Sequence, residues 1–89
     1  MKDYGQILDE CSEIANQRGE SYGTSQENFK RWREIHKTMF WVDLDEVTLA
    51  EIMISWKFAR ERQKHKEDNS IDAINYIAIR EHLIRSNLP

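Results

Sequence analysis

The sequence has few residues that break or crosslink a chain. Its 89 residues include one proline, which is the last residue, and only three glycines. Long stretches are therefore free to be helical. Cys11 is the only cysteine, so an intrachain disulfide is excluded, and no Cys/His cluster has the spacing of a structural zinc site. We expect a mainly helical protein without disulfide or zinc, which fits a reducing cytoplasm.

Long apolar runs and an excess of positive charge are also missing. Nowhere do about 18 apolar residues follow one another, and the N-terminus lacks a secretory pattern, so we expect neither a membrane span nor export. Acidic residues outnumber basic ones by 16 to 13, which gives a net charge of −3. Affinity for nucleic-acid backbones needs a basic surface, so general nucleic-acid binding is not expected. Local basic clusters could still hold a small phosphorylated ligand.

The chain has the size of one small domain. It shows no internal repeat and no linker that would divide it, so we expect a single helical domain over residues 1–89. Three Trp, three Phe and three Tyr provide material for a core. A chain of this length buries only about two-thirds of its unfolded surface. Self-association would compensate, and we expect a homo-oligomer.

Hydrophobic periodicity predicts two helices in the first half of the chain. The first carries one apolar stripe from Tyr4 to Ala15 and should end at Gly19 in a left-handed cap. Thr24 and Glu27 have the spacing of a capping box, so Thr24 should cap the second helix. One face of that helix is apolar and the other is basic. The apolar face contains Phe29, Trp32, Ile35, Met39 and Phe40.

The stretch from Val47 to Lys66 is the longest periodic run and should form the central helix. Its apolar residues fall on two roughly opposite faces, so we expect other helices to cover both. Lys57 projects at the seam between these faces, where it must reach solvent or find a partner. Asp43 and Glu46 have the spacing of a looser capping box before this helix. The run ends in a cationic tail that suits a helix C-terminus.

A fourth helix should follow, with Asp68 or Asn69 as its N-cap, and should end near Arg85. One of its stripes places Asp72 in line with three large side chains, those of Tyr76, Ile79 and Leu83. Asp72 should therefore be partly buried and should need a donor. In an antiparallel hairpin of the last two helices the nearest cations are Lys57 and Arg60. We predict that Asp68 or Asp72 pairs with one of them.

The residues of these segments form a pattern that resembles a known family. The pattern consists of Arg18-x-x-x-Tyr22-Gly23, Glu27-Asn28-Phe29, Lys57-x-Ala59-Arg60, and Asp68 with Asp72 and Tyr76. It resembles a phage and prophage family of helical proteins near the nucleotide-modification-associated domains, more distantly similar to MazG-like all-α nucleotide pyrophosphohydrolases. The likeness runs from Ile7 to about Ile79. This chain has Asn75 where that family usually has glycine.

The resemblance implies a phage-encoded, oligomeric accessory protein in the cytoplasm of a bacterial host, binding a nucleotide or a nucleotide-derived signal. Carried over residue by residue, it implies a ligand site made of Arg18, Tyr22, Asn28, Lys57, Arg60, Asp68 and Asp72. Tyr22 would stack on a base, Asn28 would read its edge, and cations of the third helix would hold phosphate. A purely structural alternative stays open, in which Lys57 and Asp72 are a buried pair that fixes helix register.

Two other functions stay open. One is a protein-interaction or regulatory module that acts on a host protein, in which the exposed remainder of the two apolar faces of the third helix, with Phe40 and Trp41, docks a partner or another copy of the chain. The other is a Mg²⁺-dependent pyrophosphohydrolase of the MazG type, with Glu10, Glu13 and Asp72 as the alternative metal ligands. MazG-like enzymes pair E-x-x-E with E-x-x-D, and here the second motif lacks an acid. The sequence therefore favours ligand binding over catalysis, and we expect neither catalytic residues nor a cofactor.

Overall fold

The computed structural model describes residues 1–22 and 24–87, and of the side chains of 21 and 22 nothing is described. Its elements are all α-helices: α1 (Tyr4–Tyr22), α2 (Ser25–Phe40), α3 (Glu46–Gln63) and α4 (Glu67–Ser86). No strand occurs among the described residues. The predicted all-α fold with four helices is confirmed.

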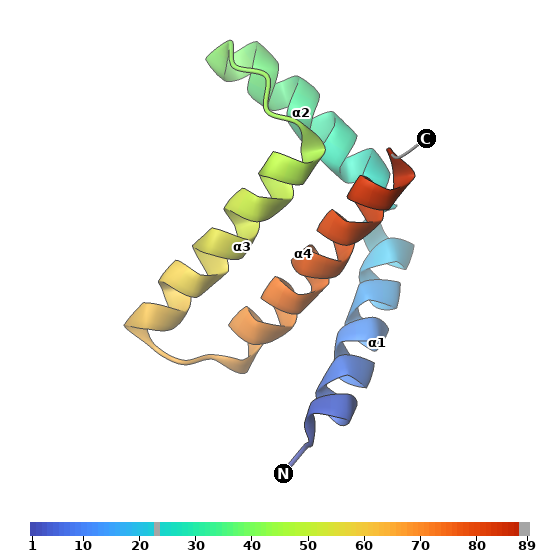
Figure 1. Ribbon diagram of the computed structural model, residues 1–89, viewed down its shortest axis with the longest axis vertical. Helices are drawn as coiled ribbons and strands as arrows, with labels where there is room; N and C mark the ends of the chain where they lie inside the picture. Colours follow the sequence, from blue (N-terminus) through green and yellow to red (C-terminus); the bar gives the residue numbers. More distant parts are fainter. Residues whose placement is uncertain (23, 88–89) are drawn as a thin grey trace.

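The helices are arranged around the hairpin of α3 and α4 (Figure 1). These two helices pack most extensively against each other, α1 packs on α4, and α2 packs on α3. Figure 1 shows α4 between α3 and α1, with α2 crossing at the end of the bundle where the C-terminus lies. The far half of α2 extends away from α1 and α4. Helices α1 and α3 therefore contact α4 from different sides.

The first helix is longer than its apolar stripe predicts. Helix α1 continues through Gly19 to Tyr22, so the predicted left-handed cap at Gly19 is wrong. A Cβ atom at Gly19 would meet no atom within 4 Å, so packing does not require glycine there. Glycine lowers helix propensity without forbidding helix, and here the helix simply passes through it. Gly23 lies outside the described residues.

Helix α2 begins as predicted but buries less of its apolar face than predicted. Thr24 is its N-cap, and the Thr24 Oγ1 accepts a hydrogen bond from the Glu27 N–H at 3.2 Å. Phe29 is buried and Trp32 is half-buried, whereas the later apolar side chains of α2 are exposed. The apolar side chains of α2 therefore pack on neighbouring helices only in its first two turns, and a later contact of α2 with α3 is the ion pair of Arg33 with Glu46. Its C-cap, Trp41, has a left-handed φ of 59° and donates its N–H to the Lys37 carbonyl at 2.9 Å.

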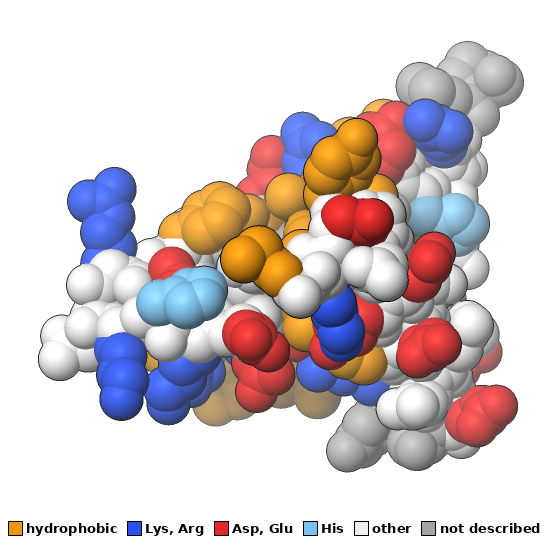
Figure 2. Space-filling model, turned by 90° about the horizontal axis from the view of Figure 1, so that it is seen from below, with side chains coloured by type: hydrophobic (Ala, Val, Ile, Leu, Met, Phe, Trp, Pro, Cys, Tyr) orange, Lys and Arg blue, Asp and Glu red, His pale blue; other side chains and the backbone are white. Residues whose placement is uncertain are grey.

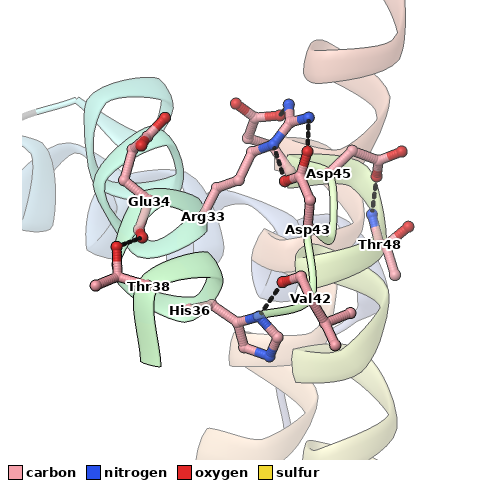
Figure 3. A network of polar contacts seen from close by, with 9 residues as sticks. Arg33, Glu34, His36, Thr38, Val42, Asp43, Asp45 and Thr48 are labelled. Carbon is pink, nitrogen blue, oxygen red and sulfur yellow. Dashed lines mark hydrogen bonds and ion pairs between the residues drawn. The ribbon is translucent and has the colours of Figure 1, made fainter. Parts of the chain in front are cut away.

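The connection from α2 to α3 is held by polar contacts (Figure 3). Asp45, rather than the predicted Asp43, is the N-cap of α3, and its Oδ1 accepts from the Thr48 N–H at 2.8 Å. Asp43 instead makes a two-pronged ion pair with Arg33, at 2.8 and 3.0 Å. Glu46 binds the same guanidinium at 2.9 Å. Arg33 thus draws both residues of the predicted capping box away from the helix terminus.

Helix α3 buries the seam between its two predicted apolar faces. Leu49 and Ala50 are fully buried, and Lys57 at the seam is largely buried. The outer members of both faces remain exposed, with Trp56 at 58% and Phe58 at 54% of their full area. Within the described chain, other helices therefore cover only part of each predicted apolar face. Figure 2, which views the end of the molecule with the N-terminus and the α3–α4 connection, shows hydrophobic side chains at the surface among charged ones.

Helix α4 begins two residues before the predicted position. Its N-cap is Lys66, without a side-chain cap, so neither Asp68 nor Asn69 has that role. Asn69 is buried, and the Glu61 carboxylate accepts from both the Lys66 N–H at 3.1 Å and the Asn69 Nδ2 at 3.5 Å. Helix α3 ends at Gln63, and the last residues of the predicted cationic tail, Lys64, His65 and Lys66, lie in the connection between α3 and α4.

The core lies where α2, α3 and α4 meet. Phe29, Leu49 and Ala50 form its buried centre. The partly buried side chains around it are those of Trp32, Leu44, Tyr76 and Ile79. The ring of Phe29 meets the ring of Tyr76 edge to face, with centroids 6.3 Å apart. This contact fixes the start of α2 against the middle of α4, next to the candidate site.

We predict that Asp45→Ala lowers the free energy of unfolding by about 1 kcal/mol, because it removes the acceptor for the Thr48 amide. Asp45→Asn keeps an acceptor and should change stability little. Urea denaturation of both variants measures the difference. If Asp45→Ala is neutral and Asp43→Ala is destabilising, then Asp43 is the cap in solution.

Candidate functional site

The carboxylate of Asp72 joins three helices. From α4 it reaches Lys57 Nζ on α3 at 2.9 Å and Arg18 Nη2 on α1, also at 2.9 Å. The prediction that Asp68 or Asp72 pairs with Lys57 or Arg60 is confirmed by the pair of Asp72 with Lys57. The sequence did not identify Arg18 as a second partner, because α1 is distant along the chain and its position against α4 was unknown. Within the described chain, neither Asp68 nor Arg60 makes an ion pair.

The environment keeps Asp72 ionised. The side chains of Asp72 and Lys57 are only 12% and 13% exposed, whereas that of Arg18 is 49% exposed. Burial alone would raise the pKa of Asp72, but the hydrogen bonds from Lys57 and Arg18 outweigh it and hold the pKa below its ordinary value. One negative charge thus faces two positive charges. The group carries a surplus positive charge, and its more accessible cation is Arg18.

Arg18 lies at the edge of a pocket of about 610 Å³ between α1, α2 and α4. The lining residues from α1 are Ala15, Arg18 and Gly19; Thr24, Ser25, Gln26, Asn28 and Phe29 come from the start of α2; and Asn75, Tyr76, Ala78, Ile79 and His82 come from α4. The lining is mostly apolar, with amide, hydroxyl and guanidinium groups around it. Pockets of this size and character hold small organic ligands.

Two features of the pocket favour a ligand with hydrogen-bond acceptors. The Nδ2 of Asn75 is buried and has no hydrogen-bond partner in the described structure. A buried amide donor without an acceptor costs free energy, and Asn75 is also one of the residues that line the pocket. The first residues of α2 also line the pocket, so the positive end of the helix dipole lies there, with the Glu27 N–H already bound by Thr24.

The structure brings some of the predicted ligand residues together and separates others. Arg18 and Asn28 line the pocket, and Lys57 and Asp72 connect to it through Arg18. Arg60 lines a separate polar pocket at the α3–α4 turn, and Asp68 is exposed. The side chain of Tyr22, predicted to stack on a base, lies outside the described residues.

Sequence reasoning missed the pocket-lining residues of α4. Asn75 and His82 were not proposed as ligand residues, and Tyr76 entered only through the family pattern and the apolar stripe. One signal was available. Asn75 follows Asp72 by three residues, and this spacing places both on neighbouring positions of one helix face.

No group of three or more His, Cys, Asp or Glu side chains is close enough to hold a metal ion in residues 1–22 and 24–87. The alternative ligand set of Glu10, Glu13 and Asp72 is therefore not gathered. Glu10 forms an ion pair with Lys2 at 2.8 Å, and Asp72 faces cations.

Among the helices described, none combines the length and the hydrophobicity that a membrane span requires.

We predict that Asp72→Ala lowers the free energy of unfolding by about 3 kcal/mol, because it leaves the buried ammonium of Lys57 without a counter-charge. The double variant Lys57→Met with Asp72→Leu removes both buried charges and should regain most of the loss. Urea denaturation compares them. Equal instability of the single and double variants would show that packing, not charge, is responsible.

The lowered pKa of Asp72 also predicts a pH dependence. The native carboxyl binds its proton less readily than the unfolded one, whose ordinary value is 3.8, so the pair stabilises the fold above that pH. This stabilisation should be lost as the pH falls from about 4 through the lower native pKa. Compared with wild type, Asp72→Asn should lose less stability over this range. Parallel stability curves for the two proteins would contradict the assignment.

Comparison of the sequence with known protein families identifies one family that it matches. Residues 6–84 match the family model described as a domain of unknown function, DUF6378. No curated protein matches the chain, and no solved structure matches it. The matched residues include parts of all four helices, the pocket and the ion pairs of Asp72. The chain therefore belongs to the DUF6378 family.

Proposed function

We propose that this protein binds a nucleotide or a nucleotide-derived signal in the pocket between α1, α2 and α4. The observation that carries the proposal is the combination, in one pocket of about 610 Å³, of a guanidinium, a helix N-terminus and an aromatic wall. Each part suits a different part of a nucleotide. Pockets of roughly 300–1,000 Å³ suit ligands of this size.

The charge of the Asp72 group supports binding of phosphate at the Arg18 edge of the pocket. Because Asp72 is shared, neither Lys57 nor Arg18 is fully neutralised. A phosphate can bind the outer side of the Arg18 guanidinium while Asp72 keeps its buried bond to Lys57. Ser25 and Gln26 at the N-terminus of α2 also line the pocket, so the positive end of this helix dipole adds to the attraction for an anion.

The other end of the pocket supports binding of a base. Phe29, Tyr76 and Ile79 provide an apolar wall against which a flat ring can pack. The Nδ2 of Asn75 is buried beside the pocket without a partner in the described part of the chain, and in our proposal the amide turns toward the ligand and donates to a ring nitrogen or a carbonyl oxygen of the base. A ligand with an aromatic ring, a hydrogen-bond acceptor on that ring and an anionic group can interact with the apolar wall, the Asn75 amide and Arg18 at the same time.

The biological setting in this proposal comes from the resemblance to phage and prophage proteins near the nucleotide-modification-associated domains. We propose a phage-encoded accessory protein that assembles with copies of itself and acts in the cytoplasm of a bacterial host. It captures its ligand and does not cleave it. The pyrophosphohydrolase alternative has no carboxylate cluster to support it among the described residues.

We predict that a panel of nucleoside phosphates and cyclic nucleotides contains a ligand that raises the melting temperature. Arg18→Gln should weaken this ligand about tenfold, because it removes a charge-assisted hydrogen bond to phosphate. Isothermal titration calorimetry measures the dissociation constants.

Arg60→Gln is the matched control, because Arg60 lies at a different pocket, and it should leave affinity unchanged. Asn75→Leu should weaken the ligand while leaving any binding of inorganic phosphate unaffected. No response to the whole panel, or equal losses in the Arg18 and Arg60 variants, would contradict the proposal.

A further inference from the structure

The chain exposes more surface than a compact protein of its mass. Its accessible surface is 7076 Å², whereas a compact monomer of this mass exposes about 5,500 Å². Its radius of gyration is 14.1 Å, against about 12 Å for a compact chain of this length. The excess of about 1,500 Å² is larger than the roughly 800 Å² that each partner buries in a standard interface.

Part of this excess lies where α2 leaves the bundle. In Figure 1 the second half of α2 and its connection to α3 extend beyond α1 and α4. The apolar side chains of this arm are 50–91% exposed. They are Ile35, Met39, Phe40, Trp41 and Val42, and we call them the α2 arm surface. Contiguous exposed apolar side chains of this kind mark interaction surfaces.

Trp41 distinguishes this surface from incidental exposure. It is the one non-glycine residue with positive φ among the described residues, and its side chain is 91% exposed. Glycine usually occupies a left-handed helix C-cap, because a side chain there is strained. The cap hydrogen bond from the Trp41 N–H to the Lys37 carbonyl offsets part of the strain, but within the described chain nothing covers this large aromatic ring. A partner would bury the ring and offset the rest of the strain.

We infer that the α2 arm surface docks the same surface of a second copy of this chain. The excess area of the whole chain exceeds one side of a standard interface, and the arm surface contributes part of this excess. The exposed charges on the arm include both signs, with Glu34 and Lys37 on the same helix, so two copies can approach without uniform repulsion. A two-fold contact of a surface with itself is the commonest way in which proteins self-associate. The inference gives the proposed self-assembly its surface and does not depend on the nucleotide pocket.

Sedimentation equilibrium of the full chain over a range of concentrations tests this inference. Wild type should have twice the mass of the chain, and Trp41→Gly should have half the mass of wild type. Glycine removes the ring and relieves the left-handed strain, so this variant should keep its helical circular dichroism and remain folded. Met39→Glu, which places a charge on the same exposed surface, should also halve the mass.

Tyr4→Glu is the control, since Tyr4 is 85% exposed on α1, outside the arm. It should leave the mass of the dimer unchanged. A wild type that is monomeric at every concentration, or an assembly of another size, overturns the inference. A dimer that survives both arm substitutions, or that Tyr4→Glu also dissociates, assigns the contact to another surface and overturns it too. Nucleotide binding by any of these variants is measured separately, so the two proposals can fail independently.

Discussion

The carboxylate of Asp72 is the constraint on which the arrangement of α1, α3 and α4 depends. A nearly buried charge must be paired, because leaving it unpaired costs more free energy than the surrounding hydrophobic contacts contribute. Here Lys57 and Arg18 pair with it from opposite sides, at 2.9 Å each. Apolar packing of α3 on α4 would tolerate several registers, but only one of them lets Lys57 meet Asp72. The bond from Arg18 then places α1 on the other side of α4.

The same arrangement connects the fold to the pocket. Arg18 belongs both to the ion pair and to the pocket wall, so the position of α1 against α4 determines the shape of the cavity. The opposite wall is fixed by the contact of Phe29 with Tyr76. A structural pair and a ligand site are therefore not exclusive alternatives for these residues. Lys57 balances the buried charge, and Arg18 is the more exposed of the two cations.

The sequence predicted the parts of this fold that depend on local patterns. Four helices, the Thr24 cap and the pairing of an aspartate of α4 with a cation of α3 follow from periodicity, capping chemistry and the position of a carboxylate on an apolar stripe. Long-range competition decided the rest. Arg33 attracts Asp43 and leaves Asp45 to cap α3, and Asn69 is buried against Glu61 instead of capping α4. The pocket depends on how α1 and α2 approach α4, which no local pattern contains.

The most direct test of the central ion pair is nitrogen-detected NMR of the lysine ammonium groups. The Lys57 ammonium should exchange its protons slowly, because it is largely buried, and should show a coupling across the hydrogen bond to the carboxyl carbon of Asp72. That coupling should disappear in Asp72→Asn. A Lys57 ammonium that exchanges as fast as the exposed lysines, with no coupling to Asp72, would contradict the account.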